Sequence, residues 1–386
     1  MKILLIGNYA HDGQESMKRV SDLFLSSLRA AGLDAEVMTP PALAGKLLPS
    51  GSGLGKWLGY IDKFFVFPIV LKRRIKQLRG QGGQSVIVHI CDHSNAFYTR
   101  VLGGVPNIVS CHDLLAIRSG LGEFPENPTR WSGKRFQSII LKGLNNARHV
   151  ACDSTATSRD LLRLSTLRED QVSVIPNALN HPYSPMPKDQ SNERIRHLLN
   201  QNGLPPTALS GDFILHVGGN QWYKNRMGVL RIYAGLRKEP GFPALVMVGK
   251  PFTTGMQDFV TANQLSAHVC QVTACDNEDL RALYSRAQAL LFPSLAEGFG
   301  WPIIEAQACG CPVVCTSGEP FLEVSGGAAL LCEAADEQGF AAALTKLRDS
   351  GERESLIRRG LENARRHDSA SMIEAYRRRY AALLAA

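Results

Sequence analysis

The chain alternates short apolar runs with longer amphipathic segments, and the alternation begins at its first residues. The run "KILLIG" at 2–7 predicts a strand, and apolar residues at helical spacing predict a helix from about Glu15 to Ala31. Gly32 then suits the C-terminal end of this helix. Further strands are predicted at 35–40, 85–90, 107–113, 149–154 and 172–177. Such an alternation predicts a parallel sheet covered by helices on both faces.

A second alternating series follows a polar, proline-containing stretch, "NHPYSPMPKDQSNE" at 180–193, which lacks apolar periodicity and is interpreted as a connection. The strands predicted in this second series are 213–219, 243–250, 268–274, 289–294, 312–317 and 328–333. From about Glu337 the tail is helical and rich in Arg and Ala. We therefore predict an α/β chain with two Rossmann-like doubly wound domains facing a central cleft, where the carboxyl ends of the strands bind ligands.

Size and composition agree with two domains. A chain of 386 residues is too long for one ordinary core. We place the first domain at 1–180, the second at 181–365, and a C-terminal helix at 366–386 that is able to cross back to the first domain. The formal net charge of +8 is compatible with an anionic ligand, a phospholipid surface or nucleic acid, and does not choose between them.

Cysteines and apolar runs bear on the compartment. The 9 cysteines are scattered through mostly apolar segments and no secretory signal precedes them, which indicates reduced thiols in the cytoplasm. Cys309, Cys311 and Cys315 lack the spacing and the nearby His of a zinc site, so structural cysteines are favoured. The longest uncharged apolar run, "FFVFPIVL" at 64–71, is far shorter than the ~20 residues that cross a bilayer. A membrane-spanning helix is therefore not expected.

The stretch "EGFGWPIIE" carries two acids eight positions apart, Glu297 and Glu305. It follows the strand predicted at 289–294, so Glu297 is expected in the loop at the carboxyl end of that strand. Pro302 suits the first turn of a helix, from which Glu305 would project. The two glycines permit close backbone approach and leave amides for an anion or a hydroxyl-rich ligand. Taken alone, the pattern also fits an acidic loop and a Glu that complements the helix dipole.

The longer segment "FPSLAEGFGWPIIEAQACGCPVV" resembles the signature of the family-four retaining glycosyltransferases of the GT-B fold, and the resemblance covers essentially the whole chain in order. It implies an acceptor-binding first domain and a donor-binding second domain. By this resemblance Glu305 binds the nucleotide ribose hydroxyls and Glu297 contacts the donor sugar at its reacting end. The backbone amides of Phe299, Gly300 and Trp301 would hold sugar hydroxyls.

A second segment, "LHVGGNQWYKNRMGVL", is similar to the strand, loop and helix that grip the donor diphosphate in this family. Lys224 matches the phosphate-binding lysine, and Gly218 and Gly219 let the backbone come near. Positive charge is needed there because the leaving group is a nucleotide diphosphate. The chain departs from the pattern at Tyr223, where many relatives carry Arg, and Arg226 is the candidate substitute. A solvated lysine at a helix start is the alternative.

Three further places follow from the resemblance. In "IVSCHDLLAIRSG", His112 and Asp113 resemble a His-Asp pair of the first domain, with His112 facing the donor sugar and the acceptor close by. In "GNYAHDGQESM" only Gly13 is a candidate for the acceptor side. This loop is not a GxGxxG motif, so a nicotinamide cofactor has little support. In "CQVTACDNEDL", backbone atoms around Thr273 and Ala274 would seat the nucleobase.

The segment 56–79, "KWLGYIDKFFVFPIVLKRRIKQLR", has seven Lys or Arg, one Asp and an apolar core. Such a basic amphipathic segment is typical of a helix on an anionic membrane face, where it would bring an enzyme to a lipid-linked acceptor. It is equally typical of a helix that covers the first sheet, with Pro68 as a break. The sequence leaves both interpretations open.

The resemblance implies a retaining glycosyltransferase that moves mannose, glucose or a similar sugar from a GDP- or UDP-sugar to a hydroxyl of a glycan or lipid-linked acceptor, in cell-surface polysaccharide or lipopolysaccharide biosynthesis. Glu297, His112 and Lys224 are the expected catalytic residues. No cofactor and no essential metal are expected. A GT-B epimerase or phosphorylase and a non-catalytic nucleotide-sugar-binding subunit are the alternatives. Nucleic acid is not an expected partner, because the basic residues are not interleaved with stacking aromatics.

Overall fold

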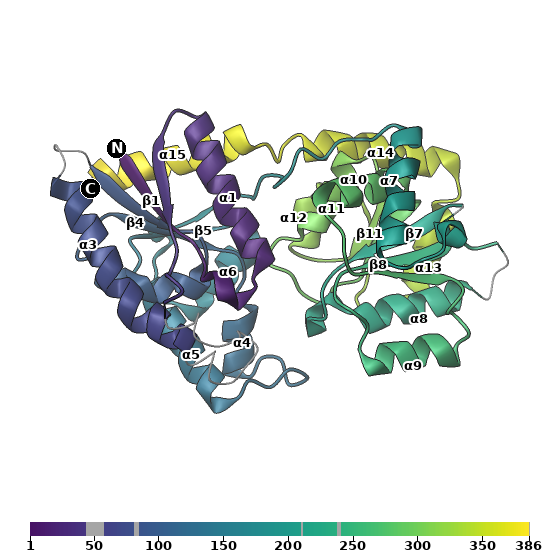
Figure 1. Cartoon of the computed structure of the whole chain (residues 1–386), viewed down its shortest axis with the longest axis horizontal. Helices are drawn as coiled ribbons and strands as arrows, with labels where there is room; N and C mark the ends of the chain where they lie inside the picture. Colours follow the sequence, from purple (N-terminus) through teal and green to yellow (C-terminus); the bar gives the residue numbers. More distant parts are fainter. Residues whose placement is uncertain (44–57, 81–84, 210, 238–240, 386) are drawn as a thin grey trace. The chain divides into compact units, whose positions relative to one another are not determined.

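The computed structural model describes residues 1–43, 58–80, 85–209, 211–237 and 241–385 (Figure 1). The chain forms two compact units. Unit 1 comprises Met1–Asn180 together with Ser369–Ala386, and unit 2 comprises His181–Asp368. Each unit contains one six-stranded parallel sheet with helices on its faces. The predicted pair of doubly wound α/β sheets is confirmed.

The sheet of unit 1 has the strand order β2-β1-β3-β4-β5-β6. Its strands are β1 (Lys2–Ile6), β2 (Asp34–Met38), β3 (Val86–Ile90), β4 (Asn107–Cys111), β5 (His149–Cys152) and β6 (Val172–Val174). Every residue of β3, β4 and β5 is buried, because helices cover both faces of this parallel sheet. Strand β1 lies between β2 and β3, so the order of addition reverses there. Ligands of such sheets bind at this kind of switch point, outside the carboxyl ends of the strands.

Helices surround this sheet on both sides. They are η1 (Ala10–Asp12), α1 (Glu15–Ala30), η3 (Asp62–Val66), α3 (Phe67–Gly80), η4 (His93–Val101), α4 (Leu115–Leu121), α5 (Trp131–Asn145), α6 (Thr155–Leu164), η5 (Glu169–Gln171) and α15 (Ser369–Ala385). Gly32 follows the end of α1 with φ +73°, which confirms its capping role. Ser154 caps α6, since its Oγ accepts a hydrogen bond from the Thr157 amide at 3.2 Å.

The segment 58–80 is helical throughout, and the predicted break at Pro68 is wrong. A π-helical turn at Asp62–Val66 precedes the proline. This wider turn accommodates a ring that cannot donate the regular backbone hydrogen bond, so the helix continues into α3. Phe67, Leu71 and Ile75 are buried, and α3 packs against β3. Residues 56 and 57 of the predicted segment lie outside the described residues.

The C-terminal helix α15 packs on unit 1 beside α1 (Figure 1). A buried polar network holds it there. His89 bonds through Nδ1 to the Tyr380 hydroxyl (2.7 Å) and through Nε2 to the Ser110 hydroxyl (2.8 Å), which in turn meets the Tyr376 hydroxyl (2.9 Å). Burial lowers the pKa of His89 to about 3, so the imidazole is neutral and donates one bond while accepting the other.

The sheet of unit 2 has the order β12-β11-β10-β7-β8-β9. Its strands are β7 (Phe213–Val217), β8 (Ala244–Val248), β9 (Val269–Val272), β10 (Ala289–Phe292), β11 (Val313–Thr316) and β12 (Leu330–Cys332). The chain adds β8 and β9 on one side of β7 and then β10, β11 and β12 on the other. The switch point of unit 2 therefore lies between β7 and β10, which pair directly.

The helices of unit 2 are α7 (Lys188–Gln201), η6 (Pro206–Leu209), η7 (Trp222–Lys224), α8 (Arg226–Leu236), α9 (Thr254–Ala262), α10 (Asn277–Arg286), α11 (Trp301–Ala308), α12 (Phe321–Ser325), α13 (Glu337–Lys346) and α14 (Ser350–Ala364). The predicted connection at 180–193 is wrong from Lys188 onward, because α7 begins there. Its buried apolar positions, Ile195, Leu198 and Leu199, all follow that stretch, so the stretch itself has no apolar period. Among the described residues, no helix is long and apolar enough to cross a membrane.

Candidate functional site

Two loops meet at the switch point of unit 2, one after β7 and one after β10. The Leu295 amide donates to the Tyr223 carbonyl at 2.7 Å. The Asn225 Nδ2 donates to the Pro293 carbonyl at 3.0 Å, while its Oδ1 accepts from the Gly228 amide and caps α8. Asn225 adopts the left-handed conformation (φ +50°) that Asn tolerates better than most residues. These bonds hold the two loops in a fixed relation.

Lys224 and Glu297 form an ion pair across these loops. The Lys224 Nζ donates to both carboxylate oxygens of Glu297, at 2.8 and 2.9 Å. The side chains are only 16% and 7% exposed, so water screens the pair weakly. The same Nζ lies 5.4 Å from the centre of the Phe292 ring and 5.5 Å from that of Tyr223. The structure thus brings together two residues that the sequence assigns to the same ligand.

Arg226 is a buried cation at the first residue of α8, and its side chain is 4% exposed. Its Nη1 donates to the Lys250 carbonyl (2.7 Å) and to the Asn220 side chain, and its guanidinium lies 5.3 Å from the Phe252 ring centre. Within the described part of the chain, its Nε and Nη2 have no hydrogen-bond partner and no carboxylate pairs with it. Burial lowers its pKa to about 10. Two buried, unused donors fit an anionic ligand.

The turns after β7 and β8 approach each other closely. A Cβ added to Gly249 would lie 2.1 Å from the Gly218 carbonyl oxygen, and one added to Gly218 would lie 3.0 Å from the His216 Nε2. His216 donates from Nδ1 to the Leu291 carbonyl, and burial lowers its pKa to about 3. A Cβ on Gly219 would meet only the Gln221 side chain. Gly249 therefore has no room for a Cβ beside the backbone after β7, whereas a Cβ on Gly218 would require His216 to move by a few tenths of an ångström.

Glu305 is buried and lies in α11, the helix that follows the loop containing Glu297. Gly300 caps this helix with φ +101°, a conformation that favours glycine, and Pro302 occupies the first turn as predicted. Since α11 begins at Trp301, Glu305 opens the second turn instead of projecting from the first. Its Oε2 accepts from the Tyr284 hydroxyl of α10 at 3.0 Å.

The remaining residues of this loop differ in exposure. Phe299 is buried and meets the His367 ring, with 5.6 Å between centroids, while Trp301 is half-buried. The loop after β9 is exposed at Thr273 and Ala274. Their amides both donate to the Asn202 Oδ1, at 2.9 and 3.0 Å, and the Asn202 Nδ2 donates to the Ala274 carbonyl. Asn202, just after α7, therefore occupies the amides assigned to the nucleobase.

At the switch point of unit 1, Asn8 follows β1 and Asp92 follows β3. The Asn8 Nδ2 donates to the Asp92 Oδ2 at 2.5 Å, and the Asn95 Nδ2 donates to the Asn8 Oδ1 at 2.9 Å. Ser94 adds bonds from its amide (2.9 Å) and its hydroxyl (2.6 Å) to Asp92. Burial opposes the charge, but nearby His93 and these hydrogen bonds lower the pKa of Asp92. Sequence reasoning missed this cluster, and the only available signal was its place after two neighbouring strands.

His112 is enclosed by protein groups. Its Nε2 donates to the Cys91 carbonyl at 2.8 Å, and its Nδ1 lies 3.3 Å from the Asp153 Oδ2, which also accepts from the Asn177 amide group at 3.0 Å. Burial disfavours the cation, but Asp153 outweighs it and raises the pKa of His112 to about 9. Burial raises the pKa of Asp153 to about 6, so at neutral pH both are charged. The role of His112 toward a donor sugar stays a prediction, and Asp153 was missed.

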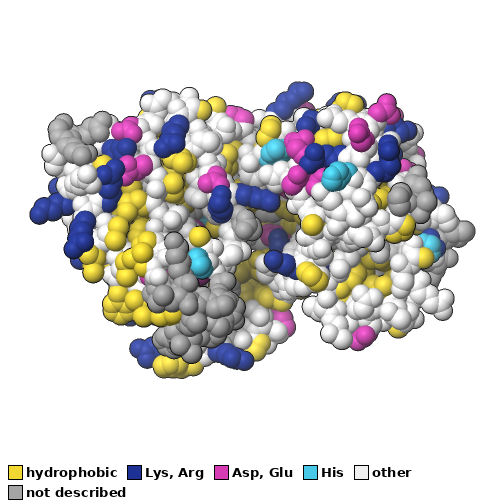
Figure 2. Space-filling view, viewed as in Figure 1, with side chains coloured by type: hydrophobic (Ala, Val, Ile, Leu, Met, Phe, Trp, Pro, Cys, Tyr) yellow, Lys and Arg dark blue, Asp and Glu magenta, His cyan; other side chains and the backbone are white. Residues whose placement is uncertain are grey.

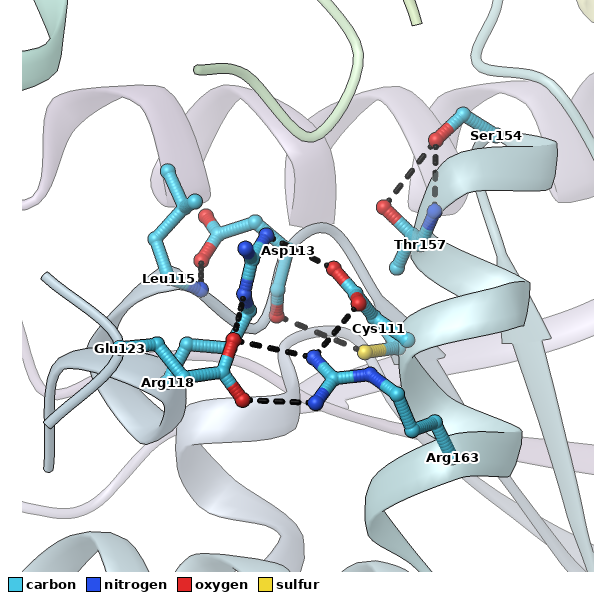
Figure 3. Close-up of polar contacts among 9 residues, drawn as sticks. Cys111, Asp113, Leu115, Arg118, Glu123, Ser154, Thr157 and Arg163 are labelled. Atoms are coloured by element: carbon cyan, nitrogen blue, oxygen red, sulfur yellow. Dashed lines mark hydrogen bonds and ion pairs between the residues drawn. The ribbon is translucent and has the colours of Figure 1, made fainter. Parts of the chain in front are cut away.

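Asp113 supports the start of α4 (Figure 3). Its Oδ1 accepts from the Leu115 amide at 2.9 Å. Figure 3 also shows Glu123 bonded to Arg118 and Arg163, both at 2.7 Å. These two cations, Arg163 foremost, lower the pKa of Glu123 to about 2. These ion pairs tie Glu123, just after α4, to Arg118 of α4 and Arg163 of α6.

Gly13, the other residue predicted for the acceptor side, is exposed and closes η1 with φ +62°. The neighbouring Asp12 pairs with Lys63 at 3.0 Å. Over the described ranges, no group of three or more His, Cys, Asp or Glu is placed to hold a metal ion. The site residues described above offer hydrogen-bonding groups and charges to a ligand.

Two family models match the chain. Residues 206–363 match the family described as Glycosyl transferases group 1, and residues 18–181 match Glycosyltransferase Family 4. Together the matches cover most of both units. The chain belongs to the family-four glycosyltransferases of the GT-B fold, as the segments around Glu297 and Lys224 predict.

Individual relatives are more distant. The O-antigen chain mannosyltransferase B of Escherichia coli is 28% identical over 249 residues, which is 62% of this chain and 62% of that protein. The chain thus matches less than two thirds of this relative's length. Sucrose-phosphate synthase of Thermosynechococcus elongatus superposes with a TM-score of 0.72 at 20% identity, covering 99% and 100% of the two chains. HepE of Anabaena, solved with UDP-glucose, gives 0.67 at 16% identity over 99% and 100%. These two likenesses concern the fold.

Proposed function

We propose that this protein transfers a sugar from a nucleotide diphosphate sugar to a hydroxyl group of a glycan or lipid-linked acceptor, with retention at the anomeric carbon. The observation that carries the proposal is the Lys224–Glu297 ion pair at the β7–β10 switch point, with the buried Arg226 two residues further along the chain. Two cations fit a diphosphate, and the carboxylate beside Lys224 fits sugar hydroxyls. Arg226 supplies the second positive charge that Tyr223 cannot.

The donor occupies unit 2 in this proposal. Lys224, Arg226 and the amides near Gly218 and Gly219 bind the diphosphate, together with the N-terminus of α8. Glu297 and the amides of 299–301 bind the sugar. Glu305 binds the ribose hydroxyls, and the exposed turn at 273–274 borders the base. Because these groups neutralise the diphosphate, no essential metal or other cofactor is required.

The reaction breaks the bond between the anomeric carbon and the β-phosphate oxygen, and the electron pair leaves with the nucleotide diphosphate. The cations at Lys224 and Arg226 stabilise that departing charge. The acceptor oxygen forms the new bond on the same face, and its proton passes to the departing phosphate oxygen. Glu297 steadies the positive charge that develops on the sugar, while His112 remains the candidate for a contact with the donor sugar, close to the acceptor.

The sugar and the pathway follow from the relatives. The O-antigen chain mannosyltransferase B supports mannose as the transferred sugar and a cell-surface polysaccharide or lipopolysaccharide as the product. HepE, solved with UDP-glucose, supports a nucleotide diphosphate sugar as donor. We include GDP- and UDP-sugars alike. Asn8 and Asp92, with Gly13 and Asp113, form the acceptor side in unit 1, and contact with the inner membrane face would bring a lipid-linked acceptor within reach.

A thermal-shift panel with GDP, UDP and their mannose and glucose conjugates tests the donor. A ligand at a hundred times its dissociation constant stabilises the protein by ~2.7 kcal/mol, a readily measured shift. The matching donor is then incubated with acceptor glycans and the product's anomeric configuration is read by NMR. Failure of every nucleotide to shift the wild type, in a preparation with cooperative unfolding, would overturn the proposal.

The epimerase and the non-catalytic subunit differ from a transferase in what happens to the donor. An epimerase changes the sugar of the donor when no acceptor is present. A non-catalytic subunit binds the donor but shows neither transfer nor slow hydrolysis, even with a range of acceptors. The same incubations therefore separate all three functions.

A further inference from the structure

The helical segment 58–80 of unit 1 has two faces of different character. On the inner face, Phe67, Leu71 and Ile75 pack into the core against the sheet. On the outer face, Ile61, Phe65 and Ile69 are 44%, 70% and 53% exposed. These three follow one another at intervals of four residues, so they lie along one side of the helix. Large side chains so exposed and so aligned indicate an interaction surface.

Basic residues continue this outer face. The exposed ones are Lys72, Arg73, Lys76 and Arg79. None of these four has an ion pair within the ranges that the structure describes. The other two cations of the segment behave differently, because Lys63 pairs with Asp12 (3.0 Å) and Arg74 with Glu36 (2.6 Å). The four positive charges are therefore available to an anionic partner.

The one acidic residue of the segment is withdrawn from this face. Asp62 is fully buried, and its Oδ2 accepts from the Tyr9 hydroxyl at 3.0 Å and from the Leu43 amide at 3.2 Å. It lies in the π-helical turn, and its hydrogen bonds point it into unit 1. The outer face consequently presents apolar and positive groups with no negative charge from its own helix.

The neighbouring helix α5 repeats this chemistry. Phe64 and Phe136 join the two helices, with ring centroids 6.0 Å apart. Helix α5 contains no acidic residue, and Trp131 at its start is 70% exposed beneath the Arg135 guanidinium. Figure 2 shows hydrophobic and basic side chains side by side over the part of unit 1 that α3 occupies in Figure 1. A tryptophan and arginines are typical of surfaces at a membrane interface.

We propose that the outer face of 58–80 docks on an anionic phospholipid bilayer. Ile61, Phe65 and Ile69 enter the boundary between headgroups and acyl chains, and Lys72, Arg73, Lys76 and Arg79 lie over lipid phosphates. Charge complementarity selects this partner, since a neutral bilayer or an ordinary protein surface would leave four positive charges unmatched. The docking is independent of the transfer chemistry, although it would place unit 1 where lipid-linked acceptors lie.

Sedimentation with large vesicles tests the proposal, using phosphatidylcholine alone or with phosphatidylglycerol added. We expect the full chain to bind the mixed vesicles, less at high salt, and to leave the neutral ones. The variant Phe65→Ser/Ile69→Ser removes apolar contact and Lys72→Gln/Lys76→Gln removes charge. Each should weaken binding to mixed vesicles by roughly tenfold or more.

Matched controls make the same changes on unit 2. Leu322→Ser/Leu331→Ser removes two other exposed apolar side chains, and Arg196→Gln/Arg358→Gln removes two exposed charges. We expect both controls to bind vesicles as the wild type does. Every variant is first checked for an unchanged melting temperature and nucleotide affinity, so a lost fold or a failed transfer assay is not mistaken for lost docking.

Three outcomes overturn the proposal. The first is that the wild type leaves the mixed vesicles unbound. The second is that the variants and their controls bind equally. The third is a dimer in light scattering that Phe65→Ser/Ile69→Ser converts to a monomer without any vesicle binding, which would make this face a contact between two copies of the chain.

Discussion

Lys224 holds both carboxylate oxygens of Glu297, although 73 positions separate the two residues in the chain. Each charge neutralises the other when no ligand is present. In the proposed function a donor diphosphate uses the same ammonium group, so Glu297 would compete with it as a built-in counter-anion. The pair would then keep the lysine ordered and limit the affinity of the site for the diphosphate product.

Glu297→Gln should separate binding from transfer. The amide keeps the shape but removes the competing charge, so the nucleotide diphosphate should bind more tightly, by up to about tenfold for each 1.4 kcal/mol released. The donor sugar loses its contact with the Glu297 carboxylate, so the transfer rate should fall by about 100-fold or more. Calorimetry with the nucleotide diphosphate and initial rates with the donor measure the two effects.

Glu333→Gln is the matched control for this variant. Glu333 bonds to the Ser317 hydroxyl and has no contact with Lys224, so both measurements should match the wild type. Weaker diphosphate binding by Glu297→Gln would contradict the competition, and an unchanged transfer rate would remove Glu297 from the catalytic residues.

Arg226→Met should weaken nucleotide binding without harming the fold. Removing a buried cation that lacks a counter-ion should leave the free energy of unfolding unchanged or raise it by about 1–2 kcal/mol. Loss of charged hydrogen bonds should weaken nucleotide diphosphate binding by about tenfold or more. Arg231 lies on the same helix as Arg226 and pairs with Glu337 of α13, and Arg231→Met should leave binding intact. If Arg226→Met binds the diphosphate normally, Arg226 is not part of the donor site.

The strand and helix pattern predicted the fold well because burial on both faces of a parallel sheet produces short apolar runs. It also predicted that Glu297 lies at the carboxyl end of a strand, while the family resemblance assigned Lys224 to the loop between a strand and a helix. The start of α7 escaped prediction, since its buried apolar residues come only after its first turn. The helix through Pro68 escaped it because a π-helical turn leaves no simple period in the sequence.

Several polar residues of the site could not be predicted for a different reason. Asn202, Asp153 and Asn8 act through hydrogen bonds to groups from other elements, and nothing in their local sequence indicates the partner. The same holds for the outer face of 58–80, where the sequence shows a basic amphipathic segment but not which apolar residues stay exposed. Such information arises only from packing.

Glu305→Gln should reduce recognition of the ribose. If the carboxylate accepts hydrogen bonds from ribose hydroxyls, the wild type should bind a nucleoside diphosphate about tenfold or more better than its dideoxy analogue, and the variant should lose most of that preference. Competition binding of the two nucleotides measures it. An equal preference in both proteins would show that Glu305 does not contact the ribose.

Tyr284→Phe tests how Glu305 is held. The change removes the hydroxyl that donates to the buried carboxylate and should cost about 1–3 kcal/mol of stability, measured by urea unfolding. Tyr233→Phe is a matched control, because Tyr233 is also buried but donates to backbone carbonyls of unit 2 far along the chain from Glu305. The nucleotide affinity of Tyr233→Phe should be unchanged, whereas the nucleotide affinity of Tyr284→Phe should fall together with its stability.

The His112–Asp153 pair should make stability depend on alkaline pH. The pKa of His112 rises from 6.5 in the unfolded chain to about 9 in the folded one, so its contribution is complete below pH 6.5 and is lost as the pH passes 9. The loss amounts to about 3 kcal/mol by the usual conversion of pKa into free energy. Asp153 acts in the same direction at lower pH, because its raised pKa of about 6 favours the folded state below pH 3.8 and this contribution is lost as the pH passes 6.

Asp153→Asn isolates this effect, since burial without the carboxylate disfavours the His112 cation. The variant should be less stable than the wild type at pH 6.5, and the difference should shrink by about 3 kcal/mol at pH 10. Urea unfolding of both proteins at the two pH values measures it, and other titrating groups cancel in the comparison. Because the imidazole would be neutral in the variant, the pH profile of transfer should also change if His112 contacts substrate. A stability difference that stays constant with pH would contradict the charged pair.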